Sequence, residues 1–219
     1  MEFAKIRNND EKIRIGKVIC VGRNYAAHAA ELGNEIPEFP IIFLKTASCL
    51  VESGSKIIHP PYSTDMHHEI ELVLVIGETV KNADDISAEN AIYGYAVGLD
   101  MTLRDIQNKL KDNGQPWTLA KVFDTSGVIS EVVLKENFKL TGTERIYLDV
   151  NGKILQDSTL DLMLFSPVEI VKFISSKMTL EKGDLIFTGT PSGVGKVVPG
   201  DKMEGGIEGV GLLSAVVSE

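Results

Sequence analysis

The stretch from His67 to Gly77, HHEIELVLVIG, constrains the fold more than any other part of the sequence. It is typical of a strand, in which successive side chains point to opposite faces. After its first residues both faces are apolar, with Val73 and Val75 on one face and leucine or isoleucine on the other, so both faces need a covering layer. The same alternation places Glu69 and Glu71 side by side, which sets two like charges at the rim of a buried strand.

The rest of the pattern favours a strand-rich α+β fold. The sequence predicts a strand pair broken at Gly16, strands at 41–45 and before Pro60, a buried strand ending near Asp100, a hairpin turning at Asn151-Gly152, and strands within 184–219. Helices are expected at 24–33, with Asn24 as N-cap and Gly33 as its end, at 102–114, where Thr102 and Asp105 have capping-box spacing, and from the N-cap Ser166 with Pro167 next. Strands outnumber helices without regular alternation, which argues against a doubly wound parallel sheet.

Length and composition favour one domain spanning residues 1–219. The formal net charge of -9 argues against nucleic acid and against an anionic membrane surface as partners, and favours a small-molecule substrate. The sequence shows no secretory signal and no segment of membrane-spanning length, so we expect a cytoplasmic protein. Cys20 and Cys49 lack CxxC spacing, and a reduced pair is expected.

Two glutamates spaced like Glu69 and Glu71 most often belong to the solvent-exposed face of a half-buried sheet. Here, however, the strand continues with apolar residues that are expected in the core. Burial and mutual repulsion raise the pKa values of such a pair, and a cation between them would remove both penalties. Asp100 ends the next buried strand, where it is either an ordinary helix cap or a third ligand. Three carboxylates favour Mg²⁺ or Mn²⁺. The neighbouring histidines, His67 and His68, could suggest zinc, but no tetrahedral ligand set accompanies them, and we expect supporting or structural roles.

Two further groups are candidates for chemistry. Lys121 lies in an apolar segment and would be an ordinary snorkelling lysine in isolation, yet beside three carboxylates and a divalent ion it can balance charge and hold a substrate carboxylate. His28 and Glu31 are spaced i, i+3 on a predicted helix, close enough to hydrogen-bond. They are either a solvated surface pair or a dyad in which Glu31 orients His28 as a general base.

The segment TGTPSGVGK does not fit a phosphate-binding P-loop. Its glycine spacing is one residue too long, Val197 stands where serine or threonine is needed, and no helix is expected after it. Its backbone N–H groups can still hold a carboxylate, so Gly189 and Thr190 remain candidates for substrate contact.

Six motifs occur along the chain in the order VGRNYAAHAAELG, FLKTAS, HHEIELVLVIG, GLDMTLRDIQ, PWTLAKVFD and LIFTGTPSGVG. In this order and spacing they strongly resemble the fumarylacetoacetate hydrolase family, and within it the short acylpyruvate hydrolase and oxaloacetate decarboxylase-like members. The resemblance covers essentially the whole chain. It implies the mixed β-roll or β-sandwich of the family's C-terminal type, with a few helices, and a homodimer.

The resemblance also assigns roles residue by residue. The family's metal ligands fall on Glu69, Glu71 and Asp100, and its catalytic groups on His28, Glu31 and Lys121. Its substrate-binding positions fall on Arg23, Lys45, Arg104, Gln107, Gly189 and Thr190. Val21 stands where the larger fumarylacetoacetate-cleaving enzyme has a further aspartate, and that enzyme's long N-terminal domain is missing. Both differences argue against fumarylacetoacetate itself as the substrate.

The predicted activity is hydrolysis of a C–C bond in an acylpyruvate, such as acetylpyruvate or fumarylpyruvate, to pyruvate and a carboxylic acid through an enolate beside Mg²⁺ or Mn²⁺. Oxaloacetate decarboxylation, keto-enol tautomerisation and isomerisation of a 2-hydroxyhepta-2,4-diene-1,7-dioate-type acid can use the same site, because each passes through an enolate. A non-catalytic metal-binding protein is the alternative from another class. Under each of these enzymatic hypotheses the expected partner is a small 2-oxo acid substrate.

Overall fold

The computed structural model describes residues 1–33 and 35–219. The helices of this part of the chain are α1 (Ala26–Glu31), α2 (Asp85–Ala91), α3 (Arg104–Asp112), α4 (Thr118–Lys121) and α5 (Pro167–Lys177), with 3-10 turns η1 (Ala47–Cys49) and η2 (Leu160–Leu162). The strands are β1 (Phe3–Lys5), β2 (Lys12–Arg14), β3 (Val18–Gly22), β4 (Ile41–Lys45), β5 (Leu50–Glu52), β6 (Lys56–Ile58), β7 (Met66–His68), β8 (Ile70–Ile76), β9 (Ile92–Asp100), β10 (Thr102–Leu103), β11 (Gly127–Ile129), β12 (Val133–Leu134), β13 (Arg145–Val150), β14 (Lys153–Thr159), β15 (Leu185–Phe187), β16 (Gly195–Val197), β17 (Lys202–Ile207) and β18 (Gly211–Ser218).

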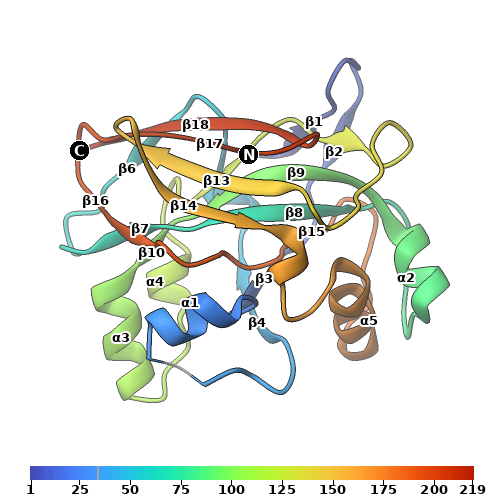
Figure 1. The fold of residues 1–219 in the computed structure, drawn as a ribbon, viewed down its shortest axis with the longest axis horizontal. Coiled ribbons are helices and arrows are strands. Elements are labelled where there is room, and N and C mark those ends of the chain that lie inside the picture. Colours follow the sequence, from blue (N-terminus) through green and yellow to red (C-terminus); the bar gives the residue numbers. More distant parts are fainter. Residues whose placement is uncertain (34) are drawn as a thin grey trace.

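Two sheets supply most of the structure. The larger has the strand order β4-β3-β15-β8-β9-β11-β5, with β12 also paired to β9, and the second has the order β14-β13-β17-β18-β6. A three-stranded sheet, β10-β7-β16, and the hairpin β1-β2 complete the described part. Figure 1 shows the second sheet above β8 and β9, with α1, α3 and α5 on the lower side of the molecule. The strand-rich α+β architecture predicted from the sequence is confirmed.

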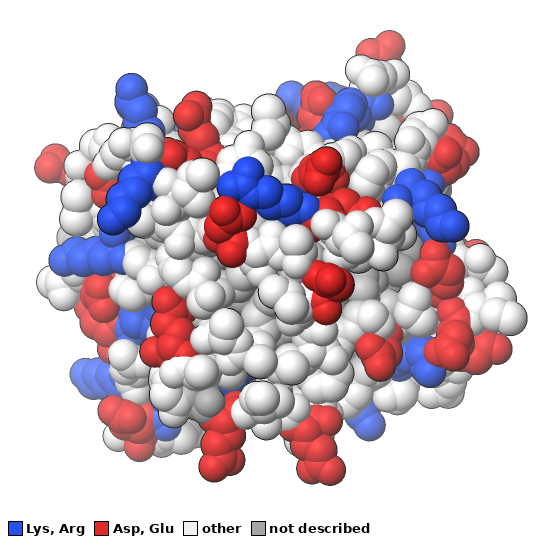
Figure 2. Space-filling view, viewed as in Figure 1, with Lys and Arg blue, Asp and Glu red and all other residues white. Residues whose placement is uncertain are grey.

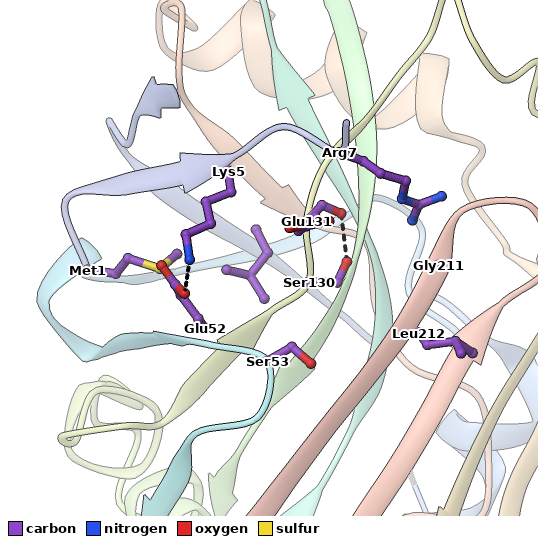
Figure 3. Close-up of a pocket in the computed structure, with 10 residues that line it drawn as sticks. Met1, Lys5, Arg7, Glu52, Ser53, Ser130, Glu131, Gly211 and Leu212 are labelled. Carbon is purple, nitrogen blue, oxygen red and sulfur yellow. Dashed lines mark hydrogen bonds and ion pairs between the residues drawn. The ribbon is translucent and has the colours of Figure 1, made fainter. Parts of the chain in front are cut away.

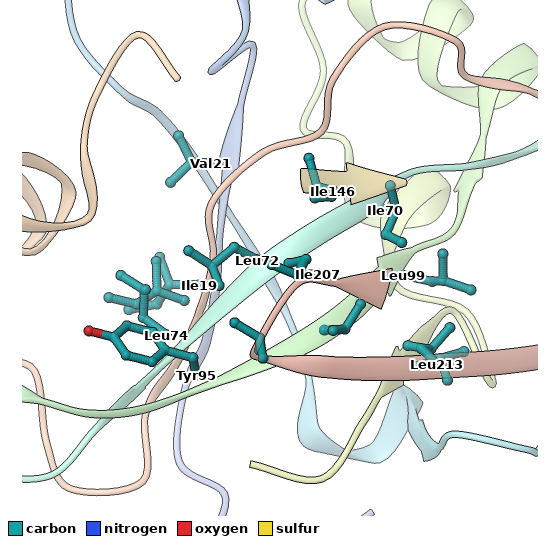
Figure 4. Packing of buried hydrophobic residues seen from close by; sticks show 14 of the residues in the cluster. Ile19, Val21, Ile70, Leu72, Leu74, Tyr95, Leu99, Ile146, Ile207 and Leu213 are labelled. Atoms are coloured by element: carbon teal, nitrogen blue, oxygen red, sulfur yellow. The ribbon is translucent and has the colours of Figure 1, made fainter. Parts of the chain in front are cut away.

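The strand β8 is central to the larger sheet and is buried along its whole length. Its leucine and isoleucine side chains join the core between the two main sheets, where Figure 4 shows Ile70 near Ile146 and Leu72 near Ile207 of the second sheet. Val73 and Val75, on the opposite face, belong to a separate cluster. The predicted burial of both faces is therefore correct, and each face has its own core.

Several local predictions are confirmed. The helix α5 begins after Ser166, whose side chain and that of Glu169 form a reciprocal capping box, and Pro167 is its first residue. The hairpin β13-β14 turns at Asn151 and Gly152, both with positive φ angles of 55° and 84°.

Two predicted helix caps are wrong. The N-cap of α1 is Tyr25, and the side chain of Asn24 instead donates to the carbonyl oxygens of Phe165 and Thr188. The N-cap of α3 is Leu103, because Thr102 pairs with His67 in β10-β7 and Asp105 accepts hydrogen bonds from the 63–64 turn. In both places tertiary contacts engage the residues that the local spacing had assigned to helix capping.

The surface in view carries charged side chains of both signs. Figure 2 shows acidic and basic side chains interspersed over one face and separated by uncharged surface. No helix in the described residues is long and apolar enough to cross a membrane. Cys20 and Cys49 are both buried and free.

Candidate metal centre and active site

Three buried carboxylates meet where β8 begins and β9 ends. The antiparallel register of β8 and β9 pairs Ile70 with Leu99, and the Asp100 N–H donates to the Glu69 carbonyl oxygen at 2.9 Å. Glu69 and Asp100 therefore lie opposite each other, and Glu71 lies on the same face as Glu69, two residues along. One carboxylate oxygen from each of the three residues lies within 4.8 Å of the others. The predicted metal ligands are thus brought together.

Buried cations surround these carboxylates. Lys121 Nζ donates to Glu69 Oε2 and Asp100 Oδ2, both at 2.7 Å, and Arg104 donates to the other oxygen of Glu69. Burial opposes ionisation of Glu69, but Lys121 and Arg104 outweigh it and hold its pKa well below the usual value. Lys45 Nζ lies 3.0 Å from Asp100 Oδ1. Lys121 was predicted from its sequence context, and the resemblance placed Lys45 and Arg104 near the site; all three contact the carboxylates here.

Within residues 1–33 and 35–219, Glu71 has no comparable cationic partner. Its Oε2 accepts the Gly189 N–H at 2.7 Å, but burial, Asp100 and Glu69 together raise its pKa well above the usual value. Among the described residues, Asp100 Oδ1 accepts no hydrogen bond of normal geometry despite the nearby lysine. A buried, under-neutralised carboxylate and an unsatisfied carboxylate oxygen fit a hard divalent cation held by oxygen ligands. These residues therefore suit Mg²⁺ or Mn²⁺.

His28 and Glu31 form a partly buried pair on α1. His28 Nδ1 lies 3.3 Å from Glu31 Oε2, and His28 itself is 5% exposed, so the solvated surface pair is excluded. Burial lowers the pKa of His28, and this outweighs the opposite effects of Glu69 and Glu31. The imidazole is therefore neutral at neutral pH. With Nδ1–H directed at Glu31, the other ring nitrogen carries the lone pair that a general base needs.

The glycine-rich loop after β15 links the metal centre to this pair. The Gly189 N–H binds Glu71, and the Gly193 N–H donates to Glu31 Oε1 at 3.0 Å. Glu31 is thereby held on one oxygen by the loop while its other oxygen faces His28. Gly193 has a φ angle of 96°, and a Cβ atom there would lie 2.0 Å from the Leu155 carbonyl oxygen. Only glycine fits this position without a shift of the loop.

A cavity of about 40 Å³ joins these groups. It is lined by Val21, Gly22, Arg23, His28, Leu32, Phe43, Glu69, Glu71, Arg104, Gln107, Lys111, Trp117, Lys121 and Thr190. Space of this size holds about one water molecule, so the cavity has to widen before a substrate can enter.

The residues predicted to contact substrate fall into two groups. Arg23, Arg104, Gln107 and Thr190 line the cavity. Lys45 does not line it, because its ammonium is enclosed by Asp100, Ser126 and backbone carbonyl groups. The Gly189 N–H is likewise committed to Glu71. Lys45 and Gly189 thus lie behind the three carboxylates and hold Asp100 and Glu71, and their contact with substrate stays a prediction.

Sequence reasoning missed a buried network under the loop. Gln156 of β14 donates to Thr190 Oγ1 at 2.8 Å and to the Pro191 carbonyl oxygen at 2.9 Å. Its own oxygen lies 3.0 Å from His68 Nδ1, which assigns the Nδ1–H tautomer to His68. Gln156 and His68 are fully buried. The expected supporting role of His68 therefore has a structural basis, whereas His67 pairs with Asp65 near the surface.

We expect Gly193→Ala to disturb the histidine–glutamate pair without removing a metal ligand. The added Cβ would push the loop from Leu155 and withdraw the N–H from Glu31, so any turnover that depends on this pair should fall about ten- to a hundredfold, the loss of one hydrogen bond to a charged group. Gly200→Ala is the matched control, since Gly200 also has positive φ but nothing lies within 4 Å of its Cβ position. Equal loss of hydrolysis in both variants would show that backbone strain alone is responsible.

A larger hollow lies elsewhere and has a different character. It measures about 580 Å³ and is lined by residues including Met1, Lys5, Arg7, Glu52 and Leu212, as Figure 3 shows. Three of its charged side chains already have partners: Lys5 and Glu52 pair at 2.6 Å, and Arg7 donates to the Val210 carbonyl oxygen. Nothing there groups titratable side chains for chemistry, so the small closed cavity is the candidate active site.

The fold and the site together define a strand-rich α+β protein with an all-carboxylate cation centre beside a buried histidine–glutamate pair. The family model for the C-terminal region of fumarylacetoacetate (FAA) hydrolase matches residues 17–218. The chain belongs to this family.

Similar proteins with known names are enzymes. Oxaloacetate tautomerase FAHD1 of Bos taurus is 42% identical over 193 residues, which cover 88% of this chain and 87% of that protein. A mitochondrial oxaloacetate decarboxylase of Dictyostelium discoideum is 46% identical over 195 residues, or 89% of each chain. The crystal structure of fumarylpyruvate hydrolase from Pseudomonas aeruginosa in complex with Mn²⁺ and pyruvate matches with a TM-score of 0.95 and 39% identity, covering 99% of this chain and 95% of that one.

Proposed function

We propose that this protein is a Mg²⁺- or Mn²⁺-dependent acylpyruvate hydrolase that cleaves 2,4-dioxo acids to pyruvate and a carboxylic acid. Glu69, Glu71 and Asp100 would hold the ion. When bound, the ion supplies Lewis-acid polarisation of the substrate's 2-oxo acid end. The observation that carries the proposal is one cavity lined by His28, Glu69 and Glu71, with Asp100 completing the carboxylate group and Glu31 beside His28 Nδ1.

The chain's own residues have separate tasks in this reaction. His28 takes a proton from the water that adds to the C4 carbonyl, and Glu31 fixes the ring and stabilises the imidazolium that forms. The C3–C4 bond then breaks, its electron pair stays with the pyruvate half, and the proton held by His28 is available for that half. Burial of the cavity under α1 keeps other water away from the reacting atoms.

Lys121, Arg104 and Gln107 would prepare the site for the 2-oxo acid end. Lys121 Nζ also donates to Thr102 Oγ1 at 2.6 Å, so it is fixed between two metal ligands and a hydroxyl group. Arg104 donates to Gln107 Oε1 at 2.6 Å, which leaves the Gln107 amide nitrogen as the group able to donate to a substrate oxygen. These contacts support a role in positioning for Arg104 and in binding for Gln107.

A comparison of three substrates tests the proposal. Purified protein with Mg²⁺ or Mn²⁺ would be given acetylpyruvate, fumarylpyruvate and oxaloacetate, with cleavage, decarboxylation and tautomerisation followed separately by absorbance. We expect loss of the diketo absorbance with one pyruvate formed per substrate consumed. Tautomerisation or decarboxylation of oxaloacetate without any cleavage of the other two acids would reject hydrolysis.

Oxaloacetate tautomerisation or decarboxylation is the second candidate activity. Two relatives bear these names, and neither reaction needs an attacking water. Isomerisation of a 2-hydroxyhepta-2,4-diene-1,7-dioate-type acid is a third use of the same site, and a structurally similar protein from Mycobacterium marinum carries that name. The buried His28–Glu31 pair supports hydrolysis by supplying a base for the attacking water, and the same base can move the carbon-bound proton in tautomerisation or isomerisation.

The remaining proposals concern assembly and place. We propose a homodimer of single-domain chains, residues 1–219, acting in the cytoplasm on a small 2-oxo acid and binding no nucleic acid or membrane. The net charge of -9 supports the last point. Several relatives are named as mitochondrial, so localisation of a tagged full-length protein is the direct test of the cytoplasmic proposal.

A further inference from the structure

The buried side chain of Gln156 connects the two main sheets beside the active site. It lies on β14 of the second sheet, whereas the glycine-rich loop that it contacts follows β15 of the larger sheet. Both N–H groups of its amide donate to this loop, to Thr190 Oγ1 at 2.8 Å and to the Pro191 carbonyl oxygen at 2.9 Å. Its oxygen accepts from the Ile70 N–H at 3.1 Å and lies 3.0 Å from His68 Nδ1. The full hydrogen-bonding capacity of the amide is therefore used, in one fixed orientation.

The oxygen of this amide meets the backbone between two metal ligands. Ile70 lies between Glu69 and Glu71, and its N–H donates to Gln156. The Ile70 carbonyl oxygen accepts from Thr190 Oγ1 at 2.7 Å, and Gln156 donates to that same hydroxyl oxygen. These hydrogen bonds form a closed set that fastens the loop to the first residues of β8.

The loop in turn holds two carboxylates with separate tasks. Its Gly189 N–H donates to Glu71 Oε2 at 2.7 Å, and its Gly193 N–H donates to Glu31 Oε1 at 3.0 Å. The two residues that receive the amide hydrogen bonds lie between these glycines. Because a backbone N–H bonds well only in a narrow range of directions, a shift of the loop weakens both contacts. The position of one loop therefore affects the metal centre and the histidine–glutamate pair together.

We propose that Gln156 is a positioning residue that couples the metal centre to the histidine–glutamate pair. Its amide holds the loop against β8, and the loop holds Glu71 for the ion and Glu31 for the orientation of His28. Gln156 acts from behind the site, since the residues that line the cavity do not include it. The part of this inference that concerns Glu31 rests on the proposed function, whereas the part that concerns Glu71 needs only metal binding.

Metal affinity tests the first part without any turnover. Gln156→Met keeps the approximate length of the side chain and removes its hydrogen bonds. We expect its affinity for Mn²⁺, measured by calorimetry without substrate, to fall about tenfold or more, because loss of a metal ligand's partner usually costs about ten- to a hundredfold. Gln115→Met makes the same change at an exposed position and should bind Mn²⁺ like the wild type. Unchanged affinity in Gln156→Met would overturn the proposal even if hydrolysis is confirmed.

A double variant tests whether Gln156 acts through the loop. Gln156→Met alone should lower kcat for hydrolysis about ten- to a hundredfold with little change in KM, as expected when one hydrogen bond to the charged Glu31 is lost. In a Gly193→Ala background that hydrogen bond is already lost, so Gln156→Met should lower kcat less than about threefold further. Losses that multiply would show independent effects and would overturn the coupling. A wild type without hydrolysis would reject the proposed function, and the Mn²⁺ measurement would still decide the role of Gln156.

Gln156→Glu is the second variant, for use if circular dichroism shows that Gln156→Met does not fold. Its carboxylate has nearly the same shape and can still accept from the Ile70 N–H and from His68, but it lacks both N–H groups that hold the loop. The same losses of Mn²⁺ affinity and kcat are expected. Wild-type values of both in folded Gln156→Glu would overturn the proposal.

Discussion

Replacing Glu71 by glutamine should abolish turnover of acylpyruvates by at least about a thousandfold and weaken Mn²⁺ binding at least about a hundredfold. Changes to residues that merely support metal ligands typically cost ten- to a hundredfold, so loss of an anionic ligand should cost more. Glu71 is the carboxylate least neutralised by the protein's own cations, because its one described hydrogen bond comes from the Gly189 N–H. The substitution keeps the size of the side chain and removes its charge. Titration with Mn²⁺ followed by a pyruvate assay measures both effects.

Glu78→Gln is the matched control for this experiment. Glu78 follows β8 closely but is exposed, so the same chemical change there should alter neither metal binding nor turnover. Retention of full Mn²⁺ affinity by Glu71→Gln would show that the ion is not held by this carboxylate. Circular dichroism of both variants establishes that the fold is intact.

Replacing His28 by alanine should separate the possible reactions. Hydrolysis of acylpyruvates should fall by about a hundred- to ten-thousandfold, the usual contribution of a positioned general base, while metal binding is kept. Decarboxylation of oxaloacetate, if the protein catalyses it, should lose less, because loss of CO2 needs neither an attacking water nor removal of a carbon-bound proton. His59→Ala is the control, since His59 lies outside the cavity. Unchanged hydrolysis in His28→Ala would remove the histidine–glutamate pair from the mechanism.

The pH dependence of hydrolysis should follow the protonation of His28. Burial lowers the pKa of His28 from its ordinary value of 6.5, and only the neutral ring can accept a proton. The rate should therefore stay level through neutral pH and decline only in the acid range below 6.5. If the residual activity of His28→Ala still declines in the acid range, that decline belongs to the titration of another group.

The sequence predicted the metal carboxylates because strand alternation carries that information. When a strand is apolar on both faces, a carboxylate at its start must lie at the edge of the core. In an antiparallel pair the end of the next strand lies opposite that start. Asp100 and His28 were candidates from their own sequence contexts, and the resemblance to a family then chose between the alternatives for each. The separate clusters on the two faces of β8 follow from the same alternation.

The parts that sequence could not supply depend on tertiary contacts. Gln156 is the one buried residue of β14, and a bulge between Leu148 and Asp149 shifts the register of the hairpin, so simple alternation does not reveal it. Lys45 looks like any strand-end lysine until Asp100 and Ser126 enclose its ammonium group. Asn24 resembles an N-cap in sequence. Its actual partners, the carbonyl oxygens of Phe165 and Thr188, are far away in the sequence and are brought to it only by the fold.

The most direct test of the account is the dependence of pyruvate release on bound metal. Protein stripped with a chelator would be titrated with Mn²⁺, and the rate of pyruvate formation from fumarylpyruvate would be plotted against Mn²⁺ per chain. We predict no hydrolysis without metal and a linear rise that ends at one Mn²⁺ per chain, since the three carboxylates form one centre. Full hydrolysis by the stripped protein, or no pyruvate at saturating Mn²⁺, would contradict the central claim.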